Sequence, residues 1–401
     1  MKSDTCKWLK LMCRQHKLVI PICMLTFFVV LPLVLKENAY SPYNKWLGTK
    51  SNASTRLKLY KLLNDKKYFE DVVYLARMPN STRKKLLNWD SGAKYKLLVT
   101  LITTSRRHHG SASEELYSPN YLTQTVARYA QIEEQRPSHQ LTDIKLVVCN
   151  VDYSTHEEVN LLSSVVDVMQ TRVHKAERIE SFELEKRDYA NCLKQSLQYN
   201  ADYILLVEDD ALPHFNLLDR LDHLFFHRVT RLNNEFGFIK LFHPTRLNGY
   251  ISPEINRLVE LAAMASLIEH AFTFILYILK INRSSSFSQR MIRFLYFLLV
   301  LLAIGRINIQ HLRALSPYLY RLVPAPSCCT PAIVFTPSSA LRMVQYLESV
   351  KCSKRFHKDS AMDAFTKVTG LQTWFFEPKL YTHIGVYTTR SDSIVDPQIV
   401  D

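Results

Sequence analysis

The chain has 401 residues, of which 47% are hydrophobic and 22% charged, and this composition is typical of folded proteins and excludes a disordered one. Only 8 residues are glycine, and the sequence contains no glycine-rich phosphate loop of the G-x-x-x-x-G-K or G-x-G-x-x-G type, which excludes a P-loop ATPase. The net charge is +14, but the basic residues are spread along the chain without zinc spacing or an RNA-binding signature, so we expect anionic membrane surfaces and phosphate-bearing ligands rather than nucleic acid.

The first predicted element is a transmembrane signal anchor at residues 18–35. This uncharged run would span roughly 27 Å as a helix, which is close to the thickness of a bilayer core. Residues 1–17 carry most of the nearby positive charge, so we predict a cytosolic tail and a luminal remainder. A cleaved signal peptide is the alternative, but the run is long for one and no clean cleavage site follows.

Residues 36–94 are predicted to form a basic, helical luminal stem. Asn52 and Asn80 each begin an N-x-[ST] glycosylation sequon, which agrees with a secretory lumen. Such triplets also arise by chance.

The folded domain is predicted to begin at residue 95 and to alternate strands with helices. The strands are "YKLLVTLITTSRR", "IKLVVCNVDYS" and "ADYILLVEDD", and the helices between them are "YLTQTVARYAQIEEQ" and "KRDYANCLKQSLQY". Nearly continuous apolar strands predict an α/β fold with a mainly parallel sheet and helices on both faces. Ligands of such sheets bind beyond the carboxyl ends of the strands. Those ends carry the candidate site residues Thr103, Arg106, Glu208, Asp209 and Asp210.

Two apolar segments, 258–280 and 291–306, divide this domain into a first part, 95–257, and a second part, 307–401. Basic residues cluster around the intervening loop, 281–290, and they favour a hairpin that crosses the membrane with a cytosolic tip. These residues are Lys280, Arg283, Arg290 and Arg293. Two buried core helices are the alternative, because the first segment carries Glu260, Glu269 and His270 and the second has an apolar run of only about 18 Å.

The cysteines predict disulfide bonds in the luminal part. Three of the 8 cysteines lie in or before the anchor, so the odd luminal count leaves at least one free thiol. We expect the adjacent Cys328 and Cys329 to pair with distant partners rather than with each other.

The acids that follow the strand at 203–207 predict a metal site. Carboxylate oxygens suit a hard divalent cation such as Mg²⁺ or Mn²⁺, and in the secretory lumen such an ion serves glycosyl transfer by stabilising the leaving diphosphate. An acidic cap on a following helix is the alternative. His383 in "YTHIGVY" is a second candidate ligand that would favour Mn²⁺, although a lone histidine is more often structural.

Five features together resemble one known family: the anchor, "RDYANCL", "YILLVEDDAL", the membrane hairpin and "HIGVYTT". The chain is similar over nearly its whole length to the Golgi GPI-GalNAc transferases, which are GT-A glycosyltransferases with an inserted hairpin. The resemblance implies a Golgi membrane protein with a luminal catalytic domain, UDP-GalNAc as donor, a core mannose of GPI-anchored proteins as acceptor, and inversion. Golgi membrane lipids are further expected partners. An N-acetylglucosaminyltransferase that branches N-glycans and a catalytically inactive Golgi scaffold are the alternatives.

By the GT-A pattern, Asp210 would contact the metal, and Glu208 and Asp209 would face the ribose or order the waters of the ion. Lys186, Arg187 and Asp188 are expected at a helix start, where they would suit the uridine and phosphates, unless they belong to an ordinary capped helix. Thr103 and Arg106 are similar candidates.

Inversion by direct displacement needs a general base for the acceptor hydroxyl. Asp359 and Asp363 lie four residues apart, which places them on one face of a helix. We favour Asp359 as the base over Asp363; a helix N-cap is its alternative role.

Overall fold

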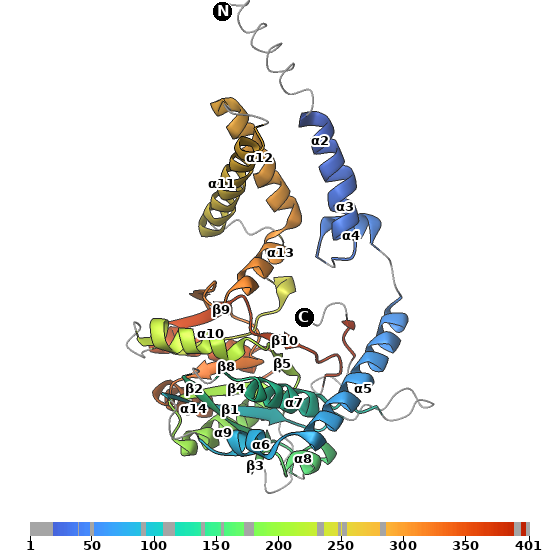
Figure 1. Cartoon of the computed structure of the whole chain (residues 1–401). Helices are drawn as coiled ribbons and strands as arrows, with labels where there is room; N and C mark the ends of the chain where they lie inside the picture. Colours follow the sequence, from blue (N-terminus) through green and yellow to red (C-terminus); the bar gives the residue numbers. More distant parts are fainter. Residues whose placement is uncertain are drawn as a thin grey trace, which may run out of the picture. The chain divides into compact units, whose positions relative to one another are not determined.

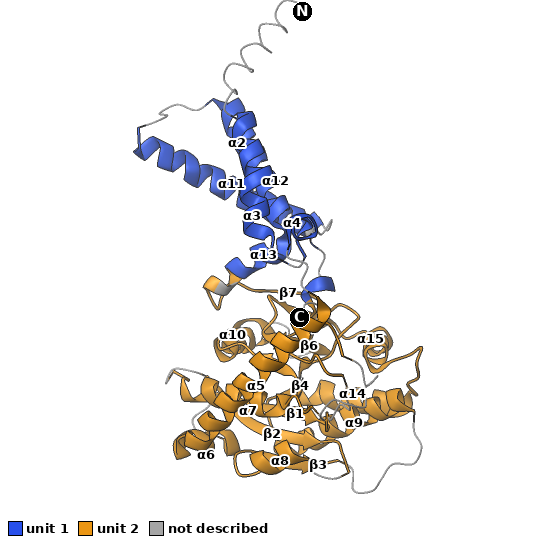
Figure 2. Ribbon diagram, turned by 90° about the vertical axis from the view of Figure 1, so that its right-hand side faces the viewer, with its two compact units in different colours: residues 1–51, 245–312 blue, residues 52–244, 313–401 orange. Residues whose placement is uncertain are grey.

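The computed structural model describes residues 19–38, 40–48, 52–89, 94–106, 117–137, 141–153, 156–171, 180–230, 236–247, 250, 255–280, 286–388 and 394–397. The predicted cytosolic tail and Arg283 lie outside the described residues. The chain forms two compact units (Figure 2). Unit 1 comprises residues 1–51 and 245–312, and unit 2 comprises residues 52–244 and 313–401.

Unit 2 is built on an eight-stranded sheet of order β3-β2-β1-β4-β8-β6-β9-β7 (Figure 1). The first four strands in this order run parallel, whereas β8 is antiparallel to both of its neighbours; β6 and β9 are again parallel, and β7 is antiparallel to β9. The strands are β1 (Tyr95–Thr103), β2 (Thr142–Asn150), β3 (Asp167–Gln170), β4 (Tyr203–Glu208), β6 (Phe238–Lys240), β7 (Arg321–Pro324), β8 (Ala332–Phe335) and β9 (Thr373–Glu377). The predicted mainly parallel α/β sheet with helices on both faces is confirmed.

Each face of the sheet has its own apolar core, which explains why the strands are almost continuously apolar. Along β4, Leu205 and Val207 pack into one core, and Ile204 and Leu206 pack into the other. The first core is covered by α6 (Asn80–Leu87), α7 (Tyr121–Glu134), α8 (Glu157–Leu162) and α10 (Leu217–His223). The second is covered by α9 (Ser181–Ser196), α14 (Pro337–Ser349) and α15 (Lys358–Thr369). Both faces are therefore closed to solvent, and the strand ends remain as the place for a site.

The segment predicted to be a stem is helical, but residues 52–89 belong to unit 2. Helix α5 (Ala53–Arg77) packs against α7. Its Asn64 is buried and donates to the carbonyl of Pro119 at 2.8 Å, and its Arg56 forms an ion pair with Asp396. These contacts are polar, so the basic composition that predicted a solvated stem gave no indication of them.

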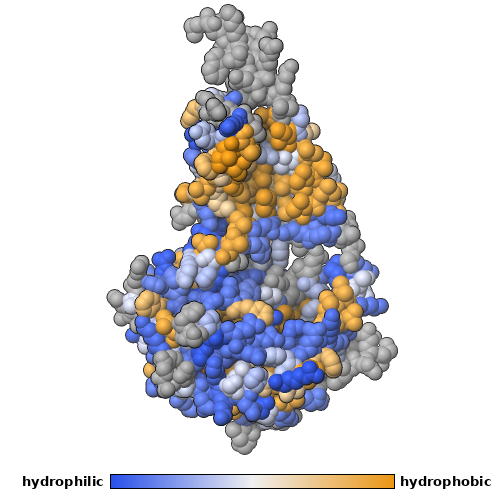
Figure 3. All heavy atoms as spheres, in the orientation of Figure 1, coloured by the Kyte–Doolittle hydropathy of each residue, from blue (hydrophilic) through white to orange (hydrophobic). Residues whose placement is uncertain are grey.

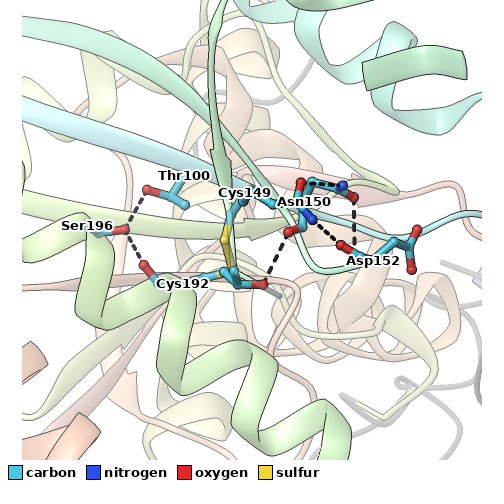
Figure 4. Close-up of a disulfide and its surroundings, with 8 residues drawn as sticks. Thr100, Cys149, Asn150, Asp152, Cys192 and Ser196 are labelled. Atoms are coloured by element: carbon cyan, nitrogen blue, oxygen red, sulfur yellow. Dashed lines mark hydrogen bonds between the residues drawn. A yellow bond between two sulfur atoms is a disulfide. The ribbon is translucent and has the colours of Figure 1, made fainter. Parts of the chain in front are cut away.

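Two disulfides lie in unit 2. Cys149–Cys192 joins β2 to α9, and beside it the Ser196 hydroxyl donates to the carbonyl of Cys192 at 2.7 Å (Figure 4). Cys328 and Cys329 are bonded to each other, so the expectation of distant partners is wrong. Cys329 has a left-handed backbone conformation with φ of 70°, and the turn brings the adjacent sulfurs together. Cys352 remains a buried free thiol.

The described residues of unit 1 include three apolar helical segments, and the face seen in Figure 3 is largely hydrophobic over them. Residues 257–278 and 287–304 are long and apolar enough to cross a membrane. Only 17% and 6% of their most apolar 18-residue stretches are buried, whereas a core helix of a soluble domain is mostly buried. The second helix begins earlier than predicted because Ser286 and Gln289 form a capping box. The helices are α11 (Ile255–Ile278), α12 (Phe287–Ile304), and the N-terminal run α2 (Val19–Leu25), η1 (Thr26–Val30) and α3 (Leu31–Leu35), with the short α4 (Pro42–Leu47) and α13 (Arg306–Gln310).

A charged cluster joins α11 to α12. Glu269 is only 3% exposed and lies 3.1 Å from Arg293 and 3.3 Å from Arg290. The Thr273 hydroxyl donates to the same carboxylate at 2.7 Å. Two arginines that we expected to flank a cytosolic loop therefore form ion pairs inside the hairpin, which lowers the cost of placing Glu269 among apolar helices.

Candidate active site

The three acids lie where β4 ends, against the end of β1. The parallel register pairs Ile102 with Glu208, and the N–H of Asp209 donates to the carbonyl of Ile102 at 3.1 Å. Thr103 then donates from its hydroxyl to Asp209 Oδ2 at 2.8 Å. The strand-end residues predicted from the sequence thus come together because neighbouring parallel strands end at the same edge.

Arg106 holds the two aspartates. Its Nη1 donates to Asp210 Oδ2 at 2.8 Å and its Nη2 pairs with Asp209, while its own side chain is only 13% exposed. Burial opposes ionisation of both carboxyls. The charge of Arg106 outweighs burial at Asp210 and lowers the pKa of that carboxyl well below its ordinary value, whereas burial and the charge of Asp210 keep the pKa of Asp209 raised.

A small antiparallel sheet brings His383 to the aspartates. Strand β5 (Ala211–Pro213) pairs with β10 (Tyr381–His383), so that His383 stands opposite Ala211. His383 Nε2 lies 3.3 Å from Asp210 Oδ2. Burial alone would lower the pKa of His383, but the negative charge of Asp210 outweighs it and raises the pKa. A Cβ at Gly385 would collide with the Asp210 carboxylate, so this close approach of the chain requires glycine.

Asp210 keeps one oxygen available. Its Oδ1 is buried and has no hydrogen-bond partner among the described residues. An orphaned carboxylate oxygen beside an imidazole is a donor set that could hold a divalent cation.

Glu208 has a different partner, which the sequence did not indicate. Lys358 Nζ lies 2.9 Å from Glu208 and 3.1 Å from Glu185, and its side chain is 4% exposed. Lys358 begins α15 and directly precedes Asp359. The acidic motif and the candidate base are therefore connected through neighbouring residues of one helix.

Asp359 and Asp363 both line a cavity of about 550 Å³, together with Phe356, His357 and Ser360. Asp359 Oδ1 accepts from the Thr330 hydroxyl at 2.9 Å and its Oδ2 accepts from the N–H of Cys329 at 3.1 Å. The N-cap of α15 is His357, so Asp359 lies in the first turn and does not cap the helix. Asp363 pairs with the exposed Lys367 at 3.2 Å.

Lys186, Arg187 and Asp188 do not stand at a helix start, because α9 begins at Ser181. Lys186 Nζ is buried and donates to the carbonyls of Leu347 and Val350, at 2.8 and 2.7 Å. The helix begins earlier because Glu183 forms ion pairs with Lys186 and Arg187 from its first turn. Lys186 thus supports the end of α14 instead of facing a ligand.

Tyr121 is a further residue that the sequence did not single out. Its hydroxyl accepts the N–H groups of Val386 at 2.9 Å and Tyr387 at 3.2 Å, and the guanidinium of Arg106 lies 5.3 Å from its ring centre. Tyr121 thereby fastens the segment that follows His383 behind Arg106. Only its position at the start of a helix near a strand end could have suggested it.

Comparisons with known proteins point to one family. A family model described as GPI-N-acetylgalactosamine transferase PGAP4 matches residues 97–382, a range that includes the acids, the cavity and the hairpin. Among solved structures, a mycobacterial protein is 14% identical, with 76% of this chain and 70% of that chain covered and a TM-score of 0.32. A CMP:2-keto-3-deoxy-manno-octonic acid synthetase complexed with CTP is 11% identical, with 72% and 91% covered and a TM-score of 0.32. Likenesses at this level support no conclusion about function.

Proposed function

The chain belongs to the GPI-N-acetylgalactosamine transferase PGAP4 family, and from this we propose that it moves GalNAc from UDP-GalNAc to a core mannose of GPI anchors, with inversion at the anomeric carbon. The family supports a glycosyltransferase that acts on GPI-anchored proteins. The proposal adds the donor, the stereochemistry and a metal ion. The observation that supports the proposal is the buried Asp210 beside His383 at the strand ends, where Asp210 Oδ1 has no hydrogen-bond partner among the described residues.

Asp210 and His383 fit a divalent cation, with Mn²⁺ preferred and Mg²⁺ possible. The Asp210 Oδ1 oxygen lacks a partner among the described residues, while Arg106 occupies Oδ2. A mixed oxygen and nitrogen donor set favours Mn²⁺ over Mg²⁺. When bound, such an ion supplies positive charge that stabilises the leaving diphosphate.

The remaining strand-end residues would hold the donor. Glu208, with a side chain 29% exposed, is the most accessible of the three acids and would face the ribose. Asp209, Thr103 and Arg106 form the hydrogen-bonded network behind it. On α9, Arg187 and Asp188 remain candidates for the uridine and phosphates, whereas the amine of Lys186 is occupied by two carbonyls.

Asp359 is our candidate for the general base. Two hydrogen bonds fix its carboxylate at the wall of the 550 Å³ cavity, which we assign to the acceptor sugar. Asp363 on the same wall is the second candidate.

The enzyme would reside in the Golgi membrane with unit 2 in the lumen. The chain leaves unit 2 after Pro244 and returns at Arg313, so α11 and α12 would tether it to the bilayer at a second point. The acceptor is itself attached to lipid, and a second tether limits the orientations of the domain, which raises the effective concentration of acceptor at the site.

The test is transfer of GalNAc by the purified full-length protein. Asp210→Ala should abolish transfer while the protein remains folded, and EDTA should abolish wild-type transfer, with Mn²⁺ restoring it best. Asp167→Ala, which changes a half-exposed acid on the edge strand β3, is the matched control and should retain transfer. Full activity in chelator would refute the metal, and a preference for UDP-GlcNAc would refute the donor. An inactive wild-type protein would favour the scaffold alternative.

A further inference from the structure

The loop before β8 is fixed by side chains from two other elements. Lys240 of β6 donates from its Nζ to two carbonyls of the loop, that of Pro326 at 2.7 Å and that of Cys328 at 2.9 Å. Lys240 is 2% exposed, and burial lowers its pKa to about 8. Burying a lysine amine costs free energy, and the two hydrogen bonds to the loop carbonyls offset this cost while they fix the loop in place.

The same loop also hydrogen-bonds Asp359 of α15. The N–H of Cys329 and the hydroxyl of Thr330 donate to the two oxygens of its carboxylate, at 3.1 and 2.9 Å. Two consecutive residues of the loop therefore orient both carboxylate oxygens of Asp359, the candidate base.

The N–H of Cys329 points at Asp359 because the residue has a left-handed conformation, with φ of 70°. Residues other than glycine rarely adopt this conformation unless their surroundings impose it. Here the covalent bond to Cys328 closes a small ring that includes the peptide between the two cysteines. Opening the ring would free Cys329 to relax to a negative φ, which turns its N–H away from the carboxylate.

The same disulfide borders the cavity, because Cys328 lines it beside Asp359, Phe356 and Asp363. We propose that the Cys328–Cys329 disulfide positions Asp359 and forms one wall of the acceptor-sugar site, so that it is a positioning element for transfer and not only a structural bond. This inference rests on the proposed function, in which Asp359 is the base and the cavity takes the mannose.

A competing use of the two cysteines is metal binding. A ring nitrogen of His243 and the sulfurs of Cys328 and Cys329 lie within 4.8 Å of one another. Two thiolates and an imidazole suit a thiophilic ion such as Zn²⁺, but the disulfide consumes both thiolates. The structure therefore favours the disulfide, and the two uses can be distinguished chemically.

Peptide mapping tests whether the disulfide exists. Trypsin releases residues 322–342, which contain Cys328 and Cys329 and no other cysteine. We expect this peptide, from protein alkylated after denaturation, to be unalkylated and lighter by two hydrogen atoms than the dithiol form, whereas Cys352 is alkylated. An alkylated peptide, or stoichiometric zinc in the native protein, would overturn the proposal.

Variants test the positioning role. Cys328→Ser/Cys329→Ser should lower kcat for transfer to a soluble mannoside by roughly tenfold or more and raise the acceptor KM, while the Kd for UDP-GalNAc stays unchanged. Cys328→Ser/Cys329→Gly should recover much of the lost kcat, because glycine adopts a positive φ without the disulfide. The matched control, Cys149→Ser/Cys192→Ser, removes a disulfide of the core and should lower the unfolding temperature without changing kcat or the acceptor KM.

A double-mutant cycle separates this inference from the proposed function. In an Asp359→Asn background, which should itself lose at least about 10²-fold in kcat, the cysteine changes should have no further effect on kcat. If Asp359→Asn transfers at the wild-type rate, the assignment of the base fails. If Asp359→Asn is inactive but Cys328→Ser/Cys329→Ser is fully active, the positioning role of the disulfide fails while the proposed function stands.

Discussion

Replacing Arg106 with methionine should strongly destabilise unit 2, because it leaves two buried carboxylates without their cation. Asp209 and Asp210 have side chains that are 4% and 5% exposed, and Arg106, at 13% exposed, pairs with both. Removing one partner of a buried ion pair costs about 3–5 kcal/mol, and the slight exposure of Arg106 places this case near 3 kcal/mol. For a unit of this size, each kcal/mol lowers the unfolding temperature by about 2–4 °C, so we expect a decrease of roughly 6–12 °C.

The assay is thermal unfolding of the purified protein without divalent cations, at one pH near 7.5. Lys194→Met is the matched control: it removes a pair whose side chains are 61% and 48% exposed, and exposed pairs contribute only about 0–1 kcal/mol. Arg106→Met/Asp209→Asn should regain much of the loss, because one uncompensated charge is gone. If Arg106→Met unfolds at the wild-type temperature, the guanidinium does not compensate the acids and our account of the site is wrong.

Two further predictions concern the membrane and pH. Replacing residues 255–304 with a short Gly/Ser loop should spare UDP-GalNAc hydrolysis and transfer to a soluble mannoside but abolish modification of membrane GPI. A tag between Ser284 and Ser288 should be reachable from the cytosol. Asn282 begins an N-x-[ST] sequon in the same loop, and its glycosylation, or a protected tag, would refute the crossing. Lys240, whose pKa burial lowers from 10.5 to about 8, binds fewer protons in the folded than in the unfolded chain between these values, so its contribution to stability rises with pH across that window. The unfolding temperature of the wild type relative to Lys240→Met should therefore increase from pH 8 to 10, and an unchanged difference would show that the amine is not buried as described.

The sequence predicted those features that depend on local pattern and strand direction. Strands β1, β2 and β4 are continuously apolar because both of their faces are buried, and this pattern was visible directly. Parallel strands end at one edge, so Thr103, Arg106 and the acids could be placed together without knowledge of the structure. Apolar length likewise indicated both hairpin helices.

The features that the sequence could not predict depend on contacts between distant residues. Lys358 meets Glu208 only because α15 packs beside β4 and α9, and no local pattern marks that lysine. Glu269 is unfavourable in an apolar helix unless it is paired, and its partners Arg290 and Arg293 come from the other helix of the hairpin. The bond between Cys328 and Cys329 depends on a left-handed residue, and the flanking sequence contains no glycine to indicate one.

Three consecutive acids lie together where strand β4 ends, although like charges repel one another. Each one is compensated by a cation from a segment far away in the sequence: Arg106 follows β1, and Lys358 begins α15. Because Lys358 is followed immediately by Asp359, the residue that pairs with Glu208 also helps to set the position of the candidate base at the cavity. A shift of α15 would therefore disturb both halves of the proposed reaction together. The ion pairs of Lys358 with Glu208 and Glu185 offset the cost of desolvating its amine, and a flexible surface lysine could pair with Glu208 without holding α15 at this position.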